Sequence, residues 1–384
     1  MSPQSKREYL LAVWFRYQKA LRKGKSKILD ELCANCHYNR KYAIRVLQNL
    51  KKPKPPRTRK QSGPKSKYRH PEFIEVLKKF WIAANLPCGK RLKTILALWR
   101  EAYQTQFGAL PNEILGKLSS ISPATIDRIL KPIRHLYRGK GRCATKPGLL
   151  LKHHIPIKTN QWDERRPGFL EADTVHHCGT SLAGLYAVTL DTVDIATEWS
   201  EQRATYGIGH HDIFEQIKEI ERSLPFSLLG LDCDNGGELL NKNIYRYLTH
   251  RRAPVQFTRS RPYYKNDNAH IEGKNWTHIR QWLGYRRFEN PEIVRLLNDL
   301  YRKEWRLFHN FFMPSMKLVE KKRIGSKIMK IHDNPKTPYQ RILESKFIPK
   351  KTKRVLKEQF KTLNPFKLRK TIDEKIAKIH RLAR

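Results

Sequence analysis

The stretch FSLLGLDCDNGGEL, residues 226–239, decides the fold class of the chain. Its apolar first half predicts a buried strand, and the Asn-Gly-Gly at 235–237 predicts the turn that ends this strand. The residues after the turn, ELLNKNIYRYLTHRR, have the apolar spacing of a helix. A strand, a turn and a helix in this order indicate an α/β domain. The same stretch carries Asp232, Asp234 and Glu238 with no Lys or Arg between them.

Acids this close together are unexpected in so basic a chain. The 384 residues include 78 Lys and Arg against 35 Asp and Glu, a formal net charge of +43, and 39% of them are hydrophobic, which is enough for ordinary cores. The length suggests two or three domains. The excess of positive charge points to a polyanionic partner, and nucleic acid is the usual one because its phosphates release counterions on binding. A ribosomal-type scaffold and a protein of anionic membrane surfaces are the alternatives.

Other features narrow the class of protein. No apolar run approaches the roughly 20 residues of a spanning helix, so we expect no membrane partner. The apolar YLLAVWF near the N-terminus is cut short by Arg16 and is not interpreted as a signal peptide. The six Cys are scattered and give no disulfide framework, which favours the cytoplasm. The sequence CANCH at 33–37 matches a haem-attachment pattern but is interpreted as coincidence, and it lacks a fourth ligand for zinc.

The α/β domain is predicted to extend over residues 165–311. Upstream of the opening stretch, short β-branched and aromatic segments predict three strands, GFLEADTVHH (168–177), AGLYAVTLDTV (183–193) and TEWSEQRAT (197–205). A helix is predicted at 209–224, a strand at 254–260, and helices at 268–284 and 290–311. Three strands followed by alternating helix and strand predict a mixed sheet.

Residues 1–50 are predicted to be helical and to form a helix-turn-helix. Ser26 and Asn39 are expected N-caps of two short helices. The second of these helices has an apolar face, whereas Arg40, Lys41 and Arg45 lie on its other face, where we expect DNA contacts. The alternative is an αα-hairpin with a solvated basic face.

The remaining segments flank the α/β domain. Residues 51–70 are basic and rich in Pro and predict a linker or an extended arm. Residues 71–135 predict a second helical DNA-binding region, whose last helix begins with Ser122 as N-cap and Pro123 and carries Arg128 toward DNA. A small helical bundle is the alternative. Residues 312–384 predict a basic C-terminal region with a strand pair and two terminal helices.

Three acids of the α/β domain occupy positions where carboxylates are costly. Asp173 lies inside the first predicted strand, Asp234 ends the fourth, and Glu272 is near the start of the helix at 268–284. Carboxylates in a buried strand need a partner, and converging ones repel each other. Mg²⁺ removes both problems, because it prefers carboxylate oxygens and keeps positions open for water and phosphate. Two such ions can clamp both oxygens of a phosphodiester displacement.

The segments EADTVHHCG (171–179), LDCDNGGEL (231–239) and SRPYYKNDNAHIEGKNW (260–276) resemble the three catalytic blocks of the DDE integrase and transposase superfamily, to which retroviral integrases belong. The resemblance covers residues 165–310. It implies an RNase H-like core, with Asp173, Asp234 and Glu272 as catalytic ligands of Mg²⁺ or Mn²⁺, two ions in all. The helical regions upstream and the basic tail resemble transposases of bacterial insertion sequences.

This resemblance implies an enzyme that cleaves the ends of a DNA element and transfers them into target DNA. The implied partners are double-stranded DNA, both terminal repeats and target, and further copies of the chain on that DNA; no nucleotide cofactor is implied. The implied location is the bacterial cytoplasm, at the nucleoid. The alternatives are a non-catalytic helix-turn-helix regulator with an integrase-like core, and a structure-specific nuclease.

Supporting roles are expected near the acids. Additional DNA contacts are predicted at Arg259, Arg261, Lys265, Lys274 and Arg280. Tyr263 and Tyr264 either stack on unpaired bases or pack in a basic loop, whereas Trp276 and Ile279 are predicted to be core.

The two aspartates of the opening stretch compete for one role. Strand alternation places Asp232 and Asp234 on one face, so the pattern does not distinguish them. Asp234 ends the strand, where α/β sheets bind ligands. It is therefore the predicted metal ligand, and Asp232 is assigned a supporting role.

Overall fold

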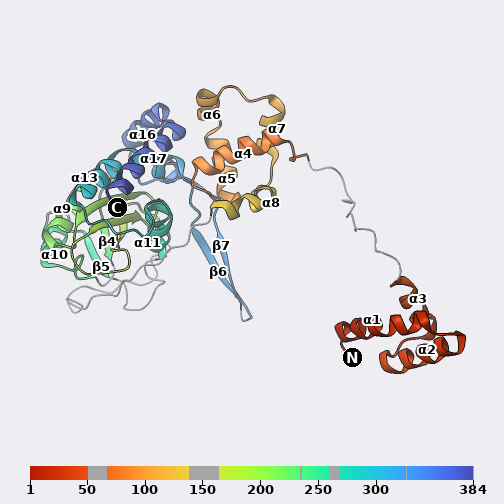
Figure 1. Cartoon of the computed structure of the whole chain (residues 1–384). Helices are drawn as coiled ribbons and strands as arrows, with labels where there is room; N and C mark the ends of the chain where they lie inside the picture. The colour runs from red at the N-terminus through yellow and green to blue at the C-terminus, as the bar shows by residue number, and fades with distance from the viewer. Residues whose placement is uncertain (51–66, 138–163, 234–235, 260–268, 326, 384) are drawn as a thin grey trace. The chain divides into compact units, whose positions relative to one another are not determined.

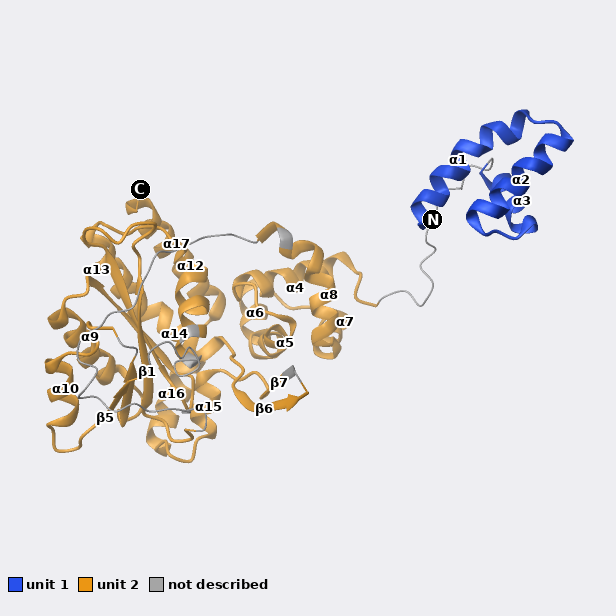
Figure 2. Ribbon diagram, turned by 90° about the horizontal axis from the view of Figure 1, so that it is seen from below, with its two compact units in different colours: residues 1–66 blue, residues 67–384 orange. Residues whose placement is uncertain are grey.

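A computed structural model shows the chain as two compact units, residues 1–66 and 67–384 (Figure 2). Each unit has its own hydrophobic core. No described helix is long and apolar enough to cross a membrane. The structure describes residues 1–50, 67–137, 164–233, 236–259, 269–325 and 327–383.

The described part of the first unit consists of the helices α1 (Pro3–Lys19), α2 (Arg22–Cys36) and α3 (Arg40–Asn49). Asn39 is confirmed as the N-cap of α3, because its Oδ1 accepts the backbone N–H of Lys41 at 3.0 Å. The prediction for Ser26 is wrong. Helix α2 already begins at Arg22, so Ser26 lies within the helix, and its Oγ accepts a hydrogen bond from Arg40 instead.

The second unit begins with helices that pack on the rest of that unit. Ser122 is confirmed as a cap, since its Oγ accepts the N–H of Thr125 at 3.2 Å. Trp99 is fully buried, and its indole N–H donates to the carbonyl of Phe312 at 3.1 Å. This region therefore shares its core with the α/β domain. Its helices are α4 (Pro71–Ala83), α5 (Gly89–Leu98), α6 (Arg100–Phe107), α7 (Asn112–Ser120) and α8 (Pro123–Arg134), followed by the short 3₁₀ turn η1 (His135–Tyr137).

The centre of the second unit is the predicted mixed sheet. Among the described residues it has five strands in the order β3-β2-β1-β4-β5. The pairs β1–β2 and β2–β3 are antiparallel, whereas β1–β4 and β4–β5 are parallel. This arrangement is consistent with the integrase-like core implied by the resemblance. The strands are β1 (Phe169–His176), β2 (Ala187–Asp194), β3 (Ser200–Tyr206), β4 (Gly230–Cys233) and β5 (Gln256–Arg259).

Helices cover both faces of this sheet (Figure 1). On one face α9 (His210–Ser223) and α10 (Lys242–Thr249) pack against Leu170, Ala172 and Leu231. The helices of the other face pack around a core that includes Val175 and Ala204. They are α11 (Ala269–Lys274), the π-helix η3 (Asn275–Arg280), α12 (Gln281–Leu283), α13 (Pro291–Leu300), the π-helix η4 (Tyr301–Trp305) and α14 (Arg306–Phe312).

The C-terminal region joins the same core. The predicted strand pair is present as β6 (Leu318–Ile324) and β7 (Lys327–His332), a separate two-stranded sheet. The described residues after it form three helices, one more than predicted. The additional helix is short and begins with a capping box at Thr337. The helices are α15 (Pro338–Glu344), α16 (Lys350–Thr362) and α17 (Pro365–Leu382).

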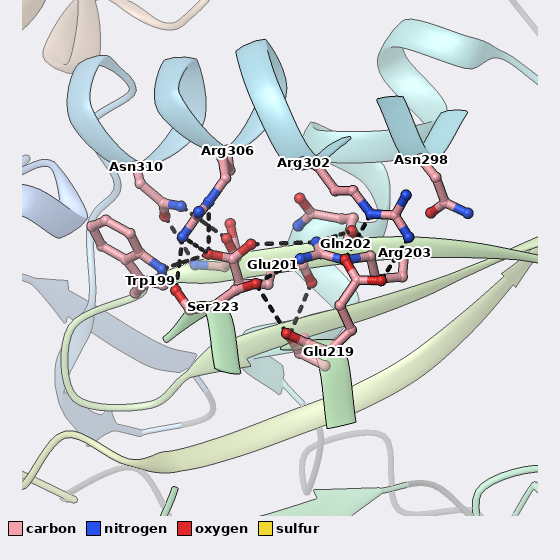
Figure 3. A network of polar contacts seen from close by, with 12 residues as sticks. Trp199, Glu201, Gln202, Arg203, Glu219, Ser223, Asn298, Arg302, Arg306 and Asn310 are labelled. Carbon is pink, nitrogen blue, oxygen red and sulfur yellow. Dashed lines mark hydrogen bonds and ion pairs between the residues drawn. The ribbon is translucent and has the colours of Figure 1, made fainter. Parts of the chain in front are cut away.

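An arginine network ties the edge strand β3 to helices on either side of it (Figure 3). Glu201 and Arg203 of β3 are 0% and 1% exposed. Arg203 donates to Glu219 of α9 at 2.7 Å, and Arg302 donates to the same carboxylate at 2.6 Å. Arg306 of α14 donates to Glu201 at 2.7 Å. We call Glu201, Arg203, Glu219, Arg302 and Arg306 the arginine network.

Candidate acidic active site

Asp173 lies in β1, near the end of the strand that has a parallel neighbour in β4. The side chain is partly buried, on the sheet face that α11 covers. Its Oδ2 accepts a hydrogen bond from the side-chain amide of Asn275 at 2.6 Å, and its Oδ1 accepts the N–H of Thr174 at 2.7 Å. Asn275 directly follows α11, so this contact fastens the helix to the strand.

A second contact fastens the beginning of the same helix. Glu171 is 1% exposed, and its Oε2 accepts the backbone N–H of Ile271 at 3.0 Å. The first N–H groups of a helix have no partner inside the helix, and its N-terminus favours negative charge. Glu171 therefore caps α11. The backbone of Glu272 lies between the two fastened positions, 271 and 275, whereas its side chain lies outside the described residues.

The third predicted acid follows strand β4. The parallel register pairs Ala172 with Cys233, and in the sequence Asp173 and Asp234 are the next residues. Asp234 itself lies outside the described residues. Asp232 is 2% exposed, is paired with Glu171 in the register, and accepts a hydrogen bond from the hydroxyl of Thr258. Its supporting role stays a prediction.

A further acid, missed in the sequence, lies on the other side of β1. Asp191 of β2 is paired with Asp173 and is fully buried. Gln202 of β3 donates to it at 2.7 Å, but burial raises the pKa of Asp191 to about 7. Paired residues of neighbouring strands point to the same face. The four side chains Glu171, Asp173, Asp191 and Asp232 are therefore on one face, and we call them the acidic row.

Glu238 belongs to the opposite face. It accepts a hydrogen bond from Thr174 at 2.8 Å, and its carboxylate is 3.9 Å from His176. Thr174 and His176 alternate with Asp173 along β1, so they point away from the acidic row. Burial acts to raise the pKa of Glu238, but nearby His176 and the hydrogen bond from Thr174 outweigh it and the pKa is lowered. Asp232 and Glu238, two acids of one short stretch of sequence, thus lie on opposite faces of the sheet.

The predicted DNA contacts of the helical regions are exposed. In α3, Lys41 is exposed, Arg40 pairs with Asp30, and Arg45 lies over the ring of Tyr42 at 5.2 Å. In α8, Arg128 is exposed and donates to Thr125 at 3.2 Å. DNA contact by these four side chains stays a prediction.

The DNA contacts predicted near the acids are at side chains that are more buried and that contact other parts of the protein. Arg259 is 7% exposed at the end of β5, and Arg280 donates to the carbonyl of His176 at 2.8 Å. Lys274 is 6% exposed and pairs with Glu198 at 3.1 Å, so its contact with DNA, which stays a prediction, would require this pair to open. The predictions for Arg261, Lys265, Tyr263 and Tyr264 fall outside the described residues.

The prediction that Trp276 is core is wrong, whereas Ile279 is confirmed as fully buried. Trp276 is 50% exposed. The prediction assumed α-helical spacing from Glu272. Residues 275–280 form a π-helix, which widens the turn and changes the side chains that face the core.

The acidic row offers carboxylate oxygens, the ligands that Mg²⁺ prefers, but no three of its four side chains, all of them described, are arranged to hold a metal ion. Asp173 is the least buried member and offers oxygens near the strand end. Among the described residues, no group of three His, Cys, Asp or Glu side chains is arranged to hold a metal ion. Of the three predicted ligands that statement covers Asp173 alone, since Asp234 and the Glu272 side chain are not described.

Alternation along β1 could have revealed part of this arrangement. Glu171 and Asp173 are two residues apart, so one face of a strand carries both. The contribution of Asn275 is harder to anticipate, because it depends on how a helix a hundred residues later lies on the strand.

Comparisons with known proteins give two kinds of likeness. No protein-family model matches the chain. Among solved structures, the catalytic core domain of BIV integrase is 17% identical, with 46% of this chain and 95% of that chain covered and a TM-score of 0.28. The HTLV-2 integrase catalytic core domain, in complex with magnesium, is 13% identical, with 39% and 91% covered and a TM-score of 0.28. A TM-score this low supports no argument about fold or activity.

The likeness in sequence is stronger. The uncharacterized protein y4rM of Sinorhizobium fredii (strain NBRC 101917 / NGR234) is 34% identical over 343 residues, which are 89% of this chain and 96% of y4rM. The match extends over nearly the full length of both proteins. The chain therefore belongs to the same protein family as y4rM.

Proposed function

We propose that the chain is a DDE transposase of the bacterial insertion-sequence type. It cleaves phosphodiesters at the ends of a DNA element and transfers the ends into target DNA. The observation that carries the proposal is the fastening of α11 to β1 through Ile271–Glu171 and Asn275–Asp173. It holds the helix that bears Glu272 against the strand that bears Asp173, two carboxylate positions a hundred residues apart in the sequence.

In this proposal Asp173, Asp234 and Glu272 hold two Mg²⁺ or Mn²⁺ ions. The bound ions supply Lewis-acid chemistry, which activates the attacking oxygen and balances charge on the phosphate. The chain's own residues set the geometry. Asn275 orients the carboxylate of Asp173, and Glu171 fixes the start of α11. The neutral donors Asn275 and Ile271 orient these acids without removing their negative charge.

The basic surface has a separate task in the proposal. Arg40, Lys41 and Arg45 on α3 and Arg128 on α8 bind element-end DNA, in the bacterial cytoplasm at the nucleoid and as a homo-oligomer. Replacing the three α3 residues by Gln should reduce the salt dependence of DNA binding by up to about one unit of slope per lost phosphate contact. Unchanged affinity and slope would contradict a role of α3 in DNA binding.

The decisive experiment uses end-labelled DNA that contains the terminal repeats. The wild-type chain should nick it in Mg²⁺ or Mn²⁺ and lose this activity in excess EDTA. Asp173→Asn should bind the same DNA with wild-type affinity and leave it intact. Metal-dependent cleavage by the Asp173→Asn protein would refute the proposed site, and cleavage in EDTA would refute the metal.

A second pair of variants tests the choice between neighbouring aspartates. Asp234→Asn should abolish cleavage and strand transfer while leaving end binding intact. Asp232→Asn should keep activity, reduced ~10–100-fold, as is usual when a residue that orients a metal ligand is changed. Both are assayed in Mn²⁺ on one DNA. If the Asp234→Asn protein cleaves and the Asp232→Asn protein does not, the ligand is Asp232.

A further inference from the structure

A cavity of about 670 Å³ opens beside the helix that bears Glu272. We call it the hairpin pocket, because the β6–β7 hairpin forms one of its walls. The loop between α4 and α5 forms another wall, and α11 with η3 forms a third. All of these elements belong to the second unit. Gly273 and Lys274, the residues directly after Glu272, both line the pocket.

The side chain of Trp276 lines this pocket. It is 50% exposed, although Trp side chains bury most of their surface when they only support a fold. A Cβ added at Gly273 would meet nothing within 4 Å, so no other part of the described chain covers the helix at this position. Planar rings that stand open beside a groove are the platforms on which nucleic-acid bases stack.

The polar side chains of the pocket favour an anionic ligand. Lys274 is neutralised by Glu198, and Lys317 donates to the carbonyls of Ile195 and Ala196. Arg91 and Lys330 add positive charge. The Nε of Arg91 is buried and has no hydrogen-bond partner in the described part of the chain. A buried guanidinium N–H without a partner costs free energy, and a phosphate oxygen satisfies it well.

The inner wall of the pocket offers a further unsatisfied group. His309 is 1% exposed and lines the cavity, and within the described residues neither ring nitrogen has a hydrogen-bond partner. Burial lowers the pKa of His309 to about 3, so the ring is neutral and has one donor and one acceptor. A neutral donor and acceptor suit the edge of a base or a bound water. Positive charge for a phosphate, an aromatic ring for a base and a neutral imidazole for the edge of the base together suit a nucleotide.

We propose that the hairpin pocket holds one unpaired nucleotide of the DNA end, with its base stacked on Trp276 and its phosphate bound by Arg91 and Lys330. This inference rests on the proposed function. Its volume lies within the 300–1,000 Å³ of typical ligand sites. Trp276 is four residues after Glu272 in the sequence. The helix that bears Glu272 therefore also forms a wall of the pocket.

The test uses the full chain carrying Asp173→Asn, so that binding is measured without cleavage. Two forms of one end DNA are compared, a blunt duplex and a duplex whose terminal bases are unpaired, with 2-aminopurine at the first unpaired position. We expect tighter binding of the unpaired form and quenching of the 2-aminopurine on binding. Adding Trp276→Ala should weaken binding of the unpaired form about 5- to 150-fold, the range for loss of one base–aromatic stack, and leave the blunt duplex unaffected.

Matched variants separate stacking and charge from general damage. Trp276→Phe should restore most of the preference, and Arg91→Lys should bind better than Arg91→Gln. Phe347→Ala removes another exposed aromatic, 58% exposed and outside the pocket, and should change nothing. Thermal unfolding of each variant checks the fold.

The outcomes distinguish this inference from the proposed function. If the Trp276→Ala protein keeps the full preference for unpaired ends and the full quenching, the inference is overturned, whatever the cleavage assay shows. If the wild-type chain prefers unpaired ends through Trp276 but cleaves no end DNA, the pocket is upheld and the transposase proposal is overturned. Equal binding of both DNA forms by the Asp173→Asn chain would also overturn the pocket.

Discussion

Two sets of carboxylates in and beside the same sheet are held by different partners. In the arginine network, Glu201 and Glu219 accept hydrogen bonds from guanidinium groups (Figure 3). In the acidic row, the donors within the described residues are neutral: a backbone N–H for Glu171, side-chain amides for Asp173 and Asp191, and a hydroxyl for Asp232. A guanidinium neutralises the carboxylate that it binds, whereas a neutral donor fixes its orientation and leaves its charge.

This difference indicates what each set does. A carboxylate bound by guanidinium groups inside a protein has its charge balanced, and breaking the pair leaves a buried charge, so it serves the fold. Carboxylates on one face repel each other when they are ionised, and the neutral amide that donates to Asp191 does not offset its burial, which raises the pKa of this acid to about 7. The partners of an acid, together with its burial, therefore suggest whether it belongs to the scaffold or to a site.

The largest expected effect is that one set controls stability and the other controls cleavage. Glu201→Gln leaves Arg203 and Arg306 facing a neutral amide, and removing one partner of a buried pair costs about 3–5 kcal/mol of the free energy of unfolding. Asp173→Asn should change that free energy by about 1 kcal/mol or less, because Asn keeps an oxygen for Asn275. Urea unfolding measures both.

Cleavage should respond in the opposite way. The Glu201→Gln protein, assayed at a temperature where it is folded, should cleave end DNA at nearly the wild-type rate, and the Asp173→Asn protein should not cleave it. A Glu201→Gln protein that is fully stable yet inactive would break the comparison, since it would place the arginine network in the catalytic machinery.

The next effect concerns Glu171, an acid of the row that acts through a helix. Glu171→Gln keeps an oxygen for the N–H of Ile271 but removes the charge at the start of α11. We expect cleavage to fall ~10–100-fold, with DNA affinity unchanged, because the helix that bears Glu272 is less well positioned. Glu72→Gln, which removes an exposed acid from the first turn of α4, is the matched control and should be neutral. A loss of DNA affinity with normal turnover would show that Glu171 has no positioning role.

The pH dependence of stability separates a buried acid held by neutral donors from an acid held by arginine. Burial raises the pKa of Asp194, which accepts from Gly168 and Thr197, to about 6. Folded protein then binds more protons than unfolded protein between about pH 4 and 6, so stability falls as pH rises, by at most about 3 kcal/mol. Burial also acts to raise the pKa of Glu219, but Arg302 and Arg203 outweigh it and lower the pKa. That contribution is present above about pH 4.5 and is lost on acidification.

The measurement is the free energy of unfolding between pH 3.5 and 7.5, roughly the range over which these carboxyls titrate. Asp194→Asn should remove the decrease between pH 4 and 6, and Glu219→Gln should flatten the loss in acid. The slopes matter here and not the absolute stabilities, since both substitutions also disturb hydrogen bonds. Identical slopes in both variants would show that arginine pairing does not distinguish the two kinds of acid.

Much of the fold follows from local sequence pattern, but the acidic row does not. The strands at 169–176, 187–194 and 200–206 were predictable from alternation and turn residues, and the caps at Asn39 and Ser122 from their short polar side chains. Pairing of Asp173 with Asp191 depends on strand register, which local pattern does not encode.

The errors have the same origin. Ser26 is a good capping residue, but α2 begins a turn earlier, where Leu21 has no capping side chain. Trp276 has core-like spacing from Glu272 only if the helix is regular, and the π-helix at 275–280 is set by tertiary packing. Glu171 contacts Ile271 across a hundred residues of sequence. Local sequence pattern does not predict features that depend on contacts between residues far apart in the sequence.

The smallest expected effect tests whether an arginine partner alone makes a pair strong. Arg295 donates to Glu292 from Nε at 2.9 Å on the exposed surface of α13, with side chains 69% and 43% exposed. Water solvates both groups in the folded and unfolded states, and holding two long side chains together costs entropy, so such pairs often contribute nothing measurable. Arg295→Gln should therefore leave the urea midpoint unchanged, and 1 M salt, which screens exposed charges, should make no difference between variant and wild type. Burial, and not the Arg–Glu contact itself, is then the reason that Glu201→Gln is costly. A loss for Arg295→Gln as large as that for Glu201→Gln would overturn this explanation, and with it the use of burial and partner together to tell scaffold acids from site acids.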